Sequence, residues 1–339
     1  MTTKLRVAVL MGGASAERDV SLSTGRQILD ALDPNKYTVY ALDTQSGQTF
    51  LPLAGLEHSV RRLRNVGGET EISALPQLPQ VSSSDRPDIV FIALHGPGGE
   101  DGTVQGMLDV LGLRYTGSGV LASALAMDKR MCKRVLTSAG VLMPADVSVT
   151  RQDQSALSDM ASLPLPWIVK PNAQGSTIGM SIVRQREELS LALETAFEHD
   201  STALVEQFVS GTEITVPVLG NDTLDVLPIV EIVPQSGFYD YAAKYTAGAT
   251  DEIVPARISP AVAAQAREIA QTCHRTLGCR GMSRTDMIVD GEGRIYTLEV
   301  NTIPGMTPTS LLPRSAQAAG LPFPRLLDRL IELALEDRR

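Results

Sequence analysis

The alternation of apolar and polar positions predicts a chain in which strands and helices follow one another. An apolar run at Leu5–Met11 leads through the turn Gly12-Gly13 into residues 20–32, whose apolar side chains recur with helical spacing. Apolar runs at Tyr37–Asp43 and Asp88–Leu94 predict two further strands. Strand, glycine turn and helix in this order are typical of an α/β unit, whose loops lie at the carboxyl ends of a parallel sheet.

The same two patterns continue towards the C-terminus. Strands are predicted at residues 113–116, 167–171, 203–209, 214–219 and 224–233, and helices at residues 105–112, 187–197, 260–277 and 323–336. The polar stretch 44–86 has no clear periodicity. A chain of 339 residues is longer than one core normally serves, so we expect two or three domains.

The most informative stretch is a predicted hairpin between Arg280 and Leu312. Segments 284–289 and 294–301 are rich in β-branched residues and flank Asp-Gly-Glu-Gly, a turn sequence. If the turn is centred on Gly291-Glu292, Arg284 lies opposite Glu299 and Asp286 lies opposite Thr297. Strand alternation then divides the side chains between two faces. The polar face holds Arg284, Asp286, Glu299 and Asn301, and the core face holds Met287, Val289, Leu298 and Val300.

Two carboxylates on the polar face of this hairpin admit two interpretations. Crowded carboxylates repel each other, and a divalent cation such as Mg²⁺, which prefers oxygen ligands, would relieve the repulsion. Alternatively, the face is solvated and Arg284 is a surface counter-ion. The following loop, residues 302–308, is uncharged and rich in turn residues, which suits the rim of a substrate site and favours the metal interpretation.

Several loops carry groups that could bind a charged ligand. Residues 95–102 contain four glycines after His95, and residues 172–183 are rich in glycine and hydroxyl groups. Residues 237–248 are aromatic and predict a lid. Glu17 follows the first strand, where it could complement the helix N-terminus or bind an ammonium group, and the residues leave both roles open. Cations on separate elements, together with the acidic hairpin, indicate a nucleotide–Mg²⁺ cleft: Lys129, Lys170, Lys244 and Arg284.

Residues 117–122 match the dinucleotide-binding pattern G-x-G-x-x-A. The strand expected before them is short and polar, and no acidic residue follows at the distance of about 20 residues that a ribose contact requires. We therefore disfavour a nicotinamide site here.

Composition excludes some other classes of function. The net charge is −9 and no block of Lys or Arg stands out, so binding to nucleic acid or to an anionic membrane is not expected. Cys132, Cys273 and Cys279 form no metal or redox motif, and their odd, sparse number fits a reducing cytosol. No apolar run is long enough to span a bilayer or to act as a signal peptide, so we expect a cytoplasmic protein.

Seven motifs in chain order resemble those of the D-alanine–D-alanine ligase family, which has the ATP-grasp fold. They are GGASAERDVSLSTG, ALHGPGGEDGTVQG, MDK, VKPNAQGSTIGM, FYDYAAKY, GCRGMSRTDM and LEVNTIPGMTPTSLLP. The resemblance covers nearly the whole chain and implies an α/β protein of three domains. These would be an N-terminal parallel-sheet domain at residues 1–117, a central α+β subdomain at 118–209 and a C-terminal α+β subdomain at 210–339.

The resemblance also implies an activity. ATP would phosphorylate the carboxylate of one D-alanine, and the amine of a second D-alanine would displace the phosphate, as peptidoglycan precursor synthesis requires. ATP would lie between the central and C-terminal subdomains with one or two Mg²⁺ ions, for which Mn²⁺ could substitute. The family suggests a homodimer.

Roles for individual residues follow from the same motifs. In the amino-acid site, Glu17 would hold the first ammonium, Ser176 and Tyr245 would link to it, and His95 would contact substrate. Arg284 and the Gly305 N–H would form the oxyanion site, and Ser310 and Leu311 would take the second carboxylate. In the nucleotide site, the phosphates would be bound by Lys129, Lys170 and Lys244, and adenine and ribose by Glu206, the backbone of Phe208 and Val209, and Glu213. Asp286, Glu299 and Asn301 would ligate the metal.

Two alternatives remain. The chain could be an ATP-grasp ligase with another acceptor, such as D-lactate or D-serine. It could also bind a nucleotide without ligase chemistry.

Overall fold

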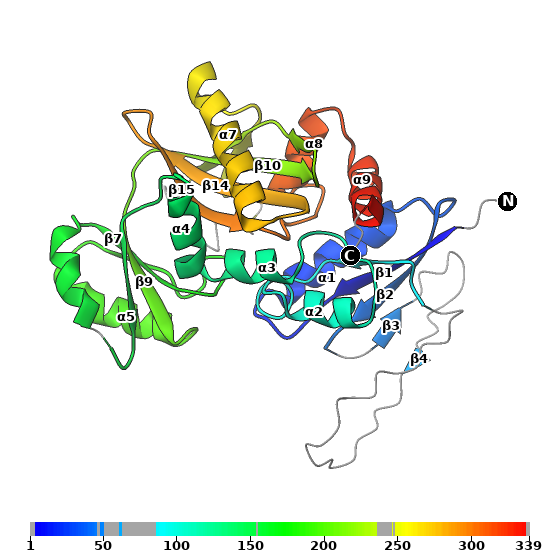
Figure 1. Ribbon diagram of the computed structural model, residues 1–339, viewed down its shortest axis with the longest axis horizontal. Coiled ribbons are helices and arrows are strands. Elements are labelled where there is room, and N and C mark those ends of the chain that lie inside the picture. The colour runs from blue at the N-terminus through cyan, green and yellow to red at the C-terminus, as the bar shows by residue number, and fades with distance from the viewer. Residues whose placement is uncertain are drawn as a thin grey trace, which may run out of the picture.

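The computed structural model describes residues 4–45, 48–50, 61–62, 86–153, 155–235, 246 and 248–336 (Figure 1). Three sheets organise these residues. Figure 1 shows them in separate regions of an elongated molecule, with the last helix returning to the first sheet. The architecture is therefore the mixed α/β and α+β arrangement expected from the sequence.

The first sheet is the parallel one that the N-terminal pattern predicts. Its parallel strands are β1 (Leu5–Met11), β2 (Tyr37–Asp43) and β5 (Ile89–Ile92), in the order β2-β1-β5. The strands β3 (Gln48–Phe50) and β4 (Arg61–Arg62) extend it antiparallel beyond β2. Helices α1 (Arg18–Ala31) and α2 (Thr103–Val110) follow β1 and β5. The strand predicted at 113–116 is reduced to a single bridge between Val90 and Tyr115.

The second sheet is antiparallel and belongs to the middle of the chain. Its order is β6 (Asp146–Thr150), β9 (Thr202–Gln207), β7 (Trp167–Pro171) and β8 (Ser181–Val183). The helix α5 (Leu189–Phe197) packs on it, and Trp167 is fully buried in their shared core. Short 3₁₀ turns flank these elements at Ser155–Ser162 and Arg186–Glu188. Helices α3 (Val120–Met127) and α4 (Lys129–Ser138) connect the first sheet to the second.

The third sheet carries the predicted hairpin. Its main path is β13 (Thr250–Ile253), β12 (Val230–Pro234), β10 (Thr212–Gly220), β14 (Gly281–Val289) and β15 (Ile295–Asn301), with β11 (Leu224–Val226) paired to β10. The single strand predicted at 224–233 is therefore two strands. Helix α7 (Pro260–Leu277) packs against this sheet, and α8 (Leu311–Ala318) and α9 (Phe323–Glu336) end the described chain.

The predicted register of the β14–β15 hairpin is wrong by two residues at its functional end. Arg284 pairs with Asn301, and Asp286 pairs with Glu299, whereas Met287 pairs with Thr297. One residue of β14 therefore corresponds to two of β15 between these pairs, which makes Leu298 the extra residue of a β-bulge. As a result Leu298 lines a cavity with Ile288 instead of entering the core, while Met287, Val289 and Val300 are buried as expected.

Helix α9 joins the end of the chain to its beginning. Its apolar face, including Leu326, Leu330 and Ile331, shares one buried core with the strands of the first sheet. Its Asp328 is buried and accepts hydrogen bonds from Tyr37 Oη at 2.8 Å and Lys36 Nζ at 2.6 Å. The same core also contains Leu219 of β10 and Met282 of β14, and it thereby joins the first sheet to the third.

A buried histidine lies between α7 and the third sheet. His274 Nδ1 and Ser283 Oγ are hydrogen-bonded at 2.8 Å, and burial lowers the pKa of His274 to about 4. The imidazole is therefore neutral in the folded protein at physiological pH.

We expect His274 to make stability depend on pH between about 4 and 6.5. The folded-state pKa lies below the usual value of 6.5, so the stabilisation is fully present above pH 6.5 and is lost as the pH falls through 4. The difference between the folded-state pKa of about 4 and the usual value of 6.5 corresponds to about 3 kcal/mol in the free energy of unfolding. Denaturant titrations should show a shallower acid decline for His274→Gln than for the wild type. Equal slopes would contradict this role. Some acid decline is expected in both proteins, because His95 also has a pKa of about 4 and is present in each.

Candidate functional site

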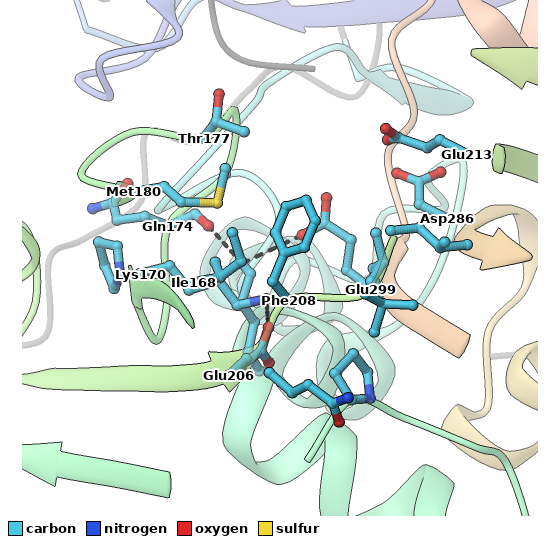
Figure 2. Close-up of a pocket in the computed structure, with 18 of the residues that line it drawn as sticks. Ile168, Lys170, Gln174, Thr177, Met180, Glu206, Phe208, Glu213, Asp286 and Glu299 are labelled. Atoms are coloured by element: carbon cyan, nitrogen blue, oxygen red, sulfur yellow. Dashed lines mark hydrogen bonds and ion pairs between the residues drawn. The ribbon is translucent and has the colours of Figure 1, made fainter. Parts of the chain in front are cut away.

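A cavity lies between the second and third sheets, and a loop of the second sheet, here called the flap, lines it. Figure 2 shows Lys170, Gln174 and Met180 on one side of it, Glu213 and Asp286 on the other, and the Phe208 ring between them. The flap is the loop at residues 172–180 that joins β7 to β8. Most of the residues predicted for the nucleotide site line this one cavity: Lys129, Lys170, Glu206, Phe208, Val209, Glu213, Asp286 and Glu299.

Apolar side chains from both sheets form the middle of this cavity. Ile168 and Met180 come from the side of the second sheet, and Ile288 and Leu298 come from the third. The bulge in β15 adds Leu298 to this face. A flat aromatic ligand therefore has apolar walls on both sides, with charged groups at the ends.

A buried carboxylate with two lysine partners lies at one end of the cavity. Glu206 Oε1 accepts from Lys133 Nζ at 2.8 Å, and Glu206 Oε2 is 2.6 Å from Lys170 Nζ. Burial alone would raise the pKa of Glu206, but the two ammonium groups outweigh it and hold the pKa below its usual value. Glu206 is therefore ionised and fixed in position.

Lys133 is a residue that the sequence interpretation missed. Besides Glu206, its Nζ donates to the Pro144 carbonyl at 2.8 Å and lies 3.1 Å from Asp146 Oδ1. A signal for it was present, because Lys133 follows Lys129 by four residues and so shares one face of α4. Like charges on the inward face of a helix require acidic partners elsewhere in the fold.

Lys129 links the flap to the acidic hairpin. Its side chain is nearly buried, and its Nζ donates to the Gln174 carbonyl at 2.6 Å and lies 3.6 Å from Glu299 Oε2. Asp128, the preceding residue, caps α4 by accepting from the Met131 N–H. The cap fixes the helix start, and the helix start directs Lys129 into the cavity.

The opposed carboxylates of β14 and β15 form the other end. Arg284 donates to both oxygens of Asp286, at 2.9 and 2.8 Å, and Asn301 Nδ2 donates to Oδ2 at 3.0 Å. The Thr215 hydroxyl on the neighbouring β10 also donates to Asp286. Arg284 is thus the counter-ion of Asp286, but within a cavity and not on a solvated face.

The donor set at this end suits a magnesium ion. Two carboxylates, Asp286 and Glu299, stand directly opposite each other, and the Asn301 amide adds an oxygen on the adjacent position. Among the described residues no group of three His, Cys, Asp or Glu side chains is close enough to form an all-protein metal cage. Mg²⁺ usually takes one or two carboxylates plus phosphate oxygens, so this set fits a phosphate-bound ion.

A second cavity adjoins the first and collects the residues predicted for the amino-acid site. Gly175 and Glu299 line both cavities. The second is also lined by Glu17, His95, Ser176, Arg284, Asn301, Gly305, Ser310 and Leu311, which come from every part of the chain. A phosphate group held beside Glu299 would therefore face ligands in either cavity.

The flap meets the N-terminal sheet through Ser176. The Ser176 hydroxyl donates to Glu17 Oε1, 159 positions away in sequence. Ser176 and Thr177 have φ values of 52° and 59°, a left-handed conformation that costs non-glycine residues about 1–3 kcal/mol each. The Glu17 contact holds the flap in this strained shape over the cavity.

His95 faces the same cavity as a neutral group. It is buried, and its Nε2 lies 3.3 Å from Thr24 Oγ1. Burial, followed by the nearby charge of Arg284, lowers the pKa of His95 to about 4. It can therefore exchange hydrogen bonds with a ligand without adding charge.

Glu100 also lines the second cavity, and the sequence interpretation did not select it. Its Oε2 accepts from the Gly96 N–H at 2.7 Å. Burial and the negative charge of Glu17 raise the pKa of Glu100 to about 8. An acidic residue inside a glycine-rich loop was the available signal, but its proximity to Glu17 depends on the fold.

Two predicted site residues, Lys244 and Tyr245, lie outside the described residues. The dinucleotide-like stretch 117–122 does not line either cavity within the described structure. Its Ser118 accepts from the Arg280 N–H at 3.2 Å, so the turn packs against the start of β14. This turn therefore has a structural role.

Comparisons with known proteins agree along the whole chain. Residues 6–118 match the family model described as D-ala D-ala ligase N-terminus, and residues 136–332 match D-ala D-ala ligase C-terminus. The D-alanine–D-alanine ligase of Syntrophobacter fumaroxidans is 47% identical over 339 residues, covering 99% of each chain.

Solved structures show the same fold. The D-alanine–D-alanine ligase of Bacillus anthracis complexed with ATP is 32% identical, with a TM-score of 0.78 and 98% of each chain covered. The VanG D-Ala:D-Ser ligase of Enterococcus faecalis is 34% identical, with a TM-score of 0.81, covering 98% of this chain and all of that one.

Replacing Lys133 by Met should destabilise the protein and weaken ATP binding. Removing one partner of a buried ion pair costs about 3–5 kcal/mol, and the lower value applies because Lys170 still contacts Glu206. Denaturant unfolding and ATP titration would measure the two effects. The matched control is Arg134→Met on the exposed side of the same helix, which should change neither. Equal losses in both variants would contradict a specific role for Lys133.

Proposed function

The chain belongs to the D-alanine–D-alanine ligase family, and from that premise we propose that it joins two D-alanines through an acyl phosphate, using the residues gathered in its two adjoining cavities. The observation that carries the proposal is the shared wall of the cavities, Gly175 and Glu299. One cavity fits a nucleotide and the other fits charged amino acids, so phosphate can pass between ligands without leaving the protein.

The first cavity binds ATP in this proposal. The apolar walls take adenine, Glu206 and the backbone at Phe208 and Val209 contact its edge, and Glu213 reaches the ribose. Lys129 and Lys170 hold the phosphates, with the Lys129 ammonium beside Glu299 and the Lys170 ammonium beside Glu206. Lys244, outside the described residues, is proposed to bind the phosphate that transfers.

Charge neutralisation explains why the end of the first cavity beside Glu299 carries acidic as well as basic side chains. Asp286, Glu299 and Asn301 would hold one or two Mg²⁺ ions, or Mn²⁺ in their place. When bound, the metal supplies positive charge to the phosphate oxygens. Arg284 then remains available for the reacting carboxylate, because its present partner Asp286 would face the cation.

The second cavity binds the amino acids. Glu17 holds the ammonium of the first D-alanine, and Ser176 and Tyr245 connect it to the flap and the lid segment. A carboxylate is a poor electrophile until one oxygen becomes a phosphate leaving group, and the acyl phosphate survives only if water is kept out. The flap contact from Ser176 to Glu17 supports that closure.

The acceptor end of the cavity is proposed to bind the second D-alanine. Ser310 and Leu311, at the start of α8, take its carboxylate, and His95, which lines the same cavity, contacts substrate. Arg284 and the Gly305 N–H stabilise the negative oxygen of the tetrahedral intermediate. A Cβ at Gly305 would lie 3.0 Å from Ser310 Oγ, so this close approach favours glycine.

The remaining partners follow from this activity. Within the part of the chain that the structure describes, no helix is long and apolar enough to cross a membrane. We propose that the protein works in the cytoplasm on small molecules, as a homodimer, without nucleic acid or membrane partners. Its product would enter peptidoglycan precursor synthesis.

Phosphate release from ATP and Mg²⁺ tests this function directly. We expect release with D-alanine, together with a dipeptide product, and none with L-alanine or without an amino acid. Adding D-serine or D-lactate beside D-alanine measures the acceptor preference and separates this activity from that of the VanG-like relative. Release that is independent of any amino acid would reject ligation.

Replacing Glu17 by Gln should raise the KM for the first D-alanine by about tenfold or more, because a charge-assisted contact to ammonium is worth about 1.5–3 kcal/mol. The KM for ATP should change little. Hydroxylamine can replace the second D-alanine and trap the acyl phosphate as a hydroxamate, so the first site is measured alone. Equal changes in both KM values would move Glu17 out of the amino-acid site.

A further inference from the structure

Glu100 occupies a central place in the amino-acid cavity. It lies in the loop between β5 and α2, and one of its oxygens is anchored by the Gly96 N–H at 2.7 Å. Gly96 has φ of 72°, and a Cβ there would lie 2.8 Å from Glu17 Oε2. Gly96 therefore stands between the two carboxylates, with no side chain to separate them.

The other acidic side chains of this cavity are either occupied or remote. Ser176 donates to Glu17, Lys129 approaches Glu299, and Arg314 Nε lies 2.7 Å from Glu252 Oε2. Asp19 is exposed at the rim. Within the described residues, Glu100 has no ion-pair partner, although it lines the cavity that must receive two ammonium groups.

The second D-alanine poses a chemical problem that these residues can solve. Its amine arrives as an ammonium ion, which has no lone pair and cannot attack the acyl phosphate. A proton acceptor must therefore lie beside the incoming nitrogen. Glu17 cannot serve both substrates if it holds the first ammonium.

We propose that the Glu100 carboxylate binds the ammonium of the second D-alanine and removes one of its protons. This inference rests on the proposed function, in which Glu17 binds the first ammonium. The freed nitrogen lone pair forms the C–N bond, and the carbonyl electron pair moves to oxygen beside Arg284. The oxygen electron pair then re-forms the carbonyl as the C–O bond to phosphate breaks. Phosphate leaves with the electrons of that C–O bond and takes the second amine proton, and Glu100 returns its proton to solvent.

The charges around Glu100 suit a proton acceptor. Glu17 at the start of α1 and Glu299 on β15 are negative, Arg284 on β14 is positive, and His95 at the end of β5 is neutral. The raised pKa makes Glu100 a stronger base than an ordinary carboxylate. Arrival of a cationic substrate favours the ionised form, because it offsets the repulsion from Glu17.

Hydroxylamine separates this role from a structural one. It is largely neutral near pH 7.5, so trapping the acyl phosphate with it needs no proton acceptor. We expect Glu100→Gln to lower dipeptide synthesis by about 10²-fold or more while hydroxamate formation stays near the wild-type rate. Glutamine can still accept the Gly96 N–H. Dipeptide synthesis by this variant should recover as the pH rises towards the pKa of the free amine.

Two comparisons make the result decisive. Asp30→Asn, an exposed carboxylate on α1 that lines neither cavity, should leave both reactions and the pH profile unchanged, whereas Glu17→Gln should impair hydroxamate formation at low D-alanine. Equal losses of dipeptide and hydroxamate in Glu100→Gln, or no loss of dipeptide, would overturn the proposal. Absence of dipeptide synthesis in the wild type would instead reject the proposed function itself.

Discussion

The opposition of Asp286 and Glu299 across β14 and β15 is the constraint on which both cavities depend. The bulge at Leu298 brings these carboxylates into register, and their repulsion requires positive charge from several directions. Arg284 supplies it from the same strand, and Lys129 supplies it from α4. The carboxylate pair beside the wall between the cavities is therefore balanced by cations from two separate elements, β14 and α4.

Charge balance also organises the end of the first cavity that lies away from Glu299. Glu206 is held by Lys133 and Lys170, which come from α4 and β7. Buried ions are tolerated only when they are paired, so these three side chains fix the position of α4 relative to the second sheet. The same helix carries Lys129 at its start, and one rigid element thus positions cations at both ends of the cavity.

The flap stores local strain where it contacts the first sheet. Ser176 and Thr177 are held in a left-handed conformation, and the hydrogen bond from Ser176 to Glu17 connects this strain to the amino-acid site. Asp328 ties α9 to the first sheet, and the core under α9 includes Met282 of the third sheet, so the flap meets a base that is itself fixed.

Local sequence patterns were enough to predict the strands β1, β2 and β7, the full extents of α7 and α9, and the family to which the order of motifs points. They also indicated which polar residues share the hairpin face, because strand alternation is a local property. The hairpin register, the lysine partners of Glu206 and the closeness of Glu100 to Glu17 became apparent only in the folded chain. Periodicity and turn chemistry act over a few residues, whereas a bulge or a buried ion pair is selected by packing between segments far apart in the chain. Lys133 and Glu100, which the sequence interpretation did not select, belong to this second kind, because Glu206 lies 73 positions from Lys133 and Glu17 lies 83 positions from Glu100.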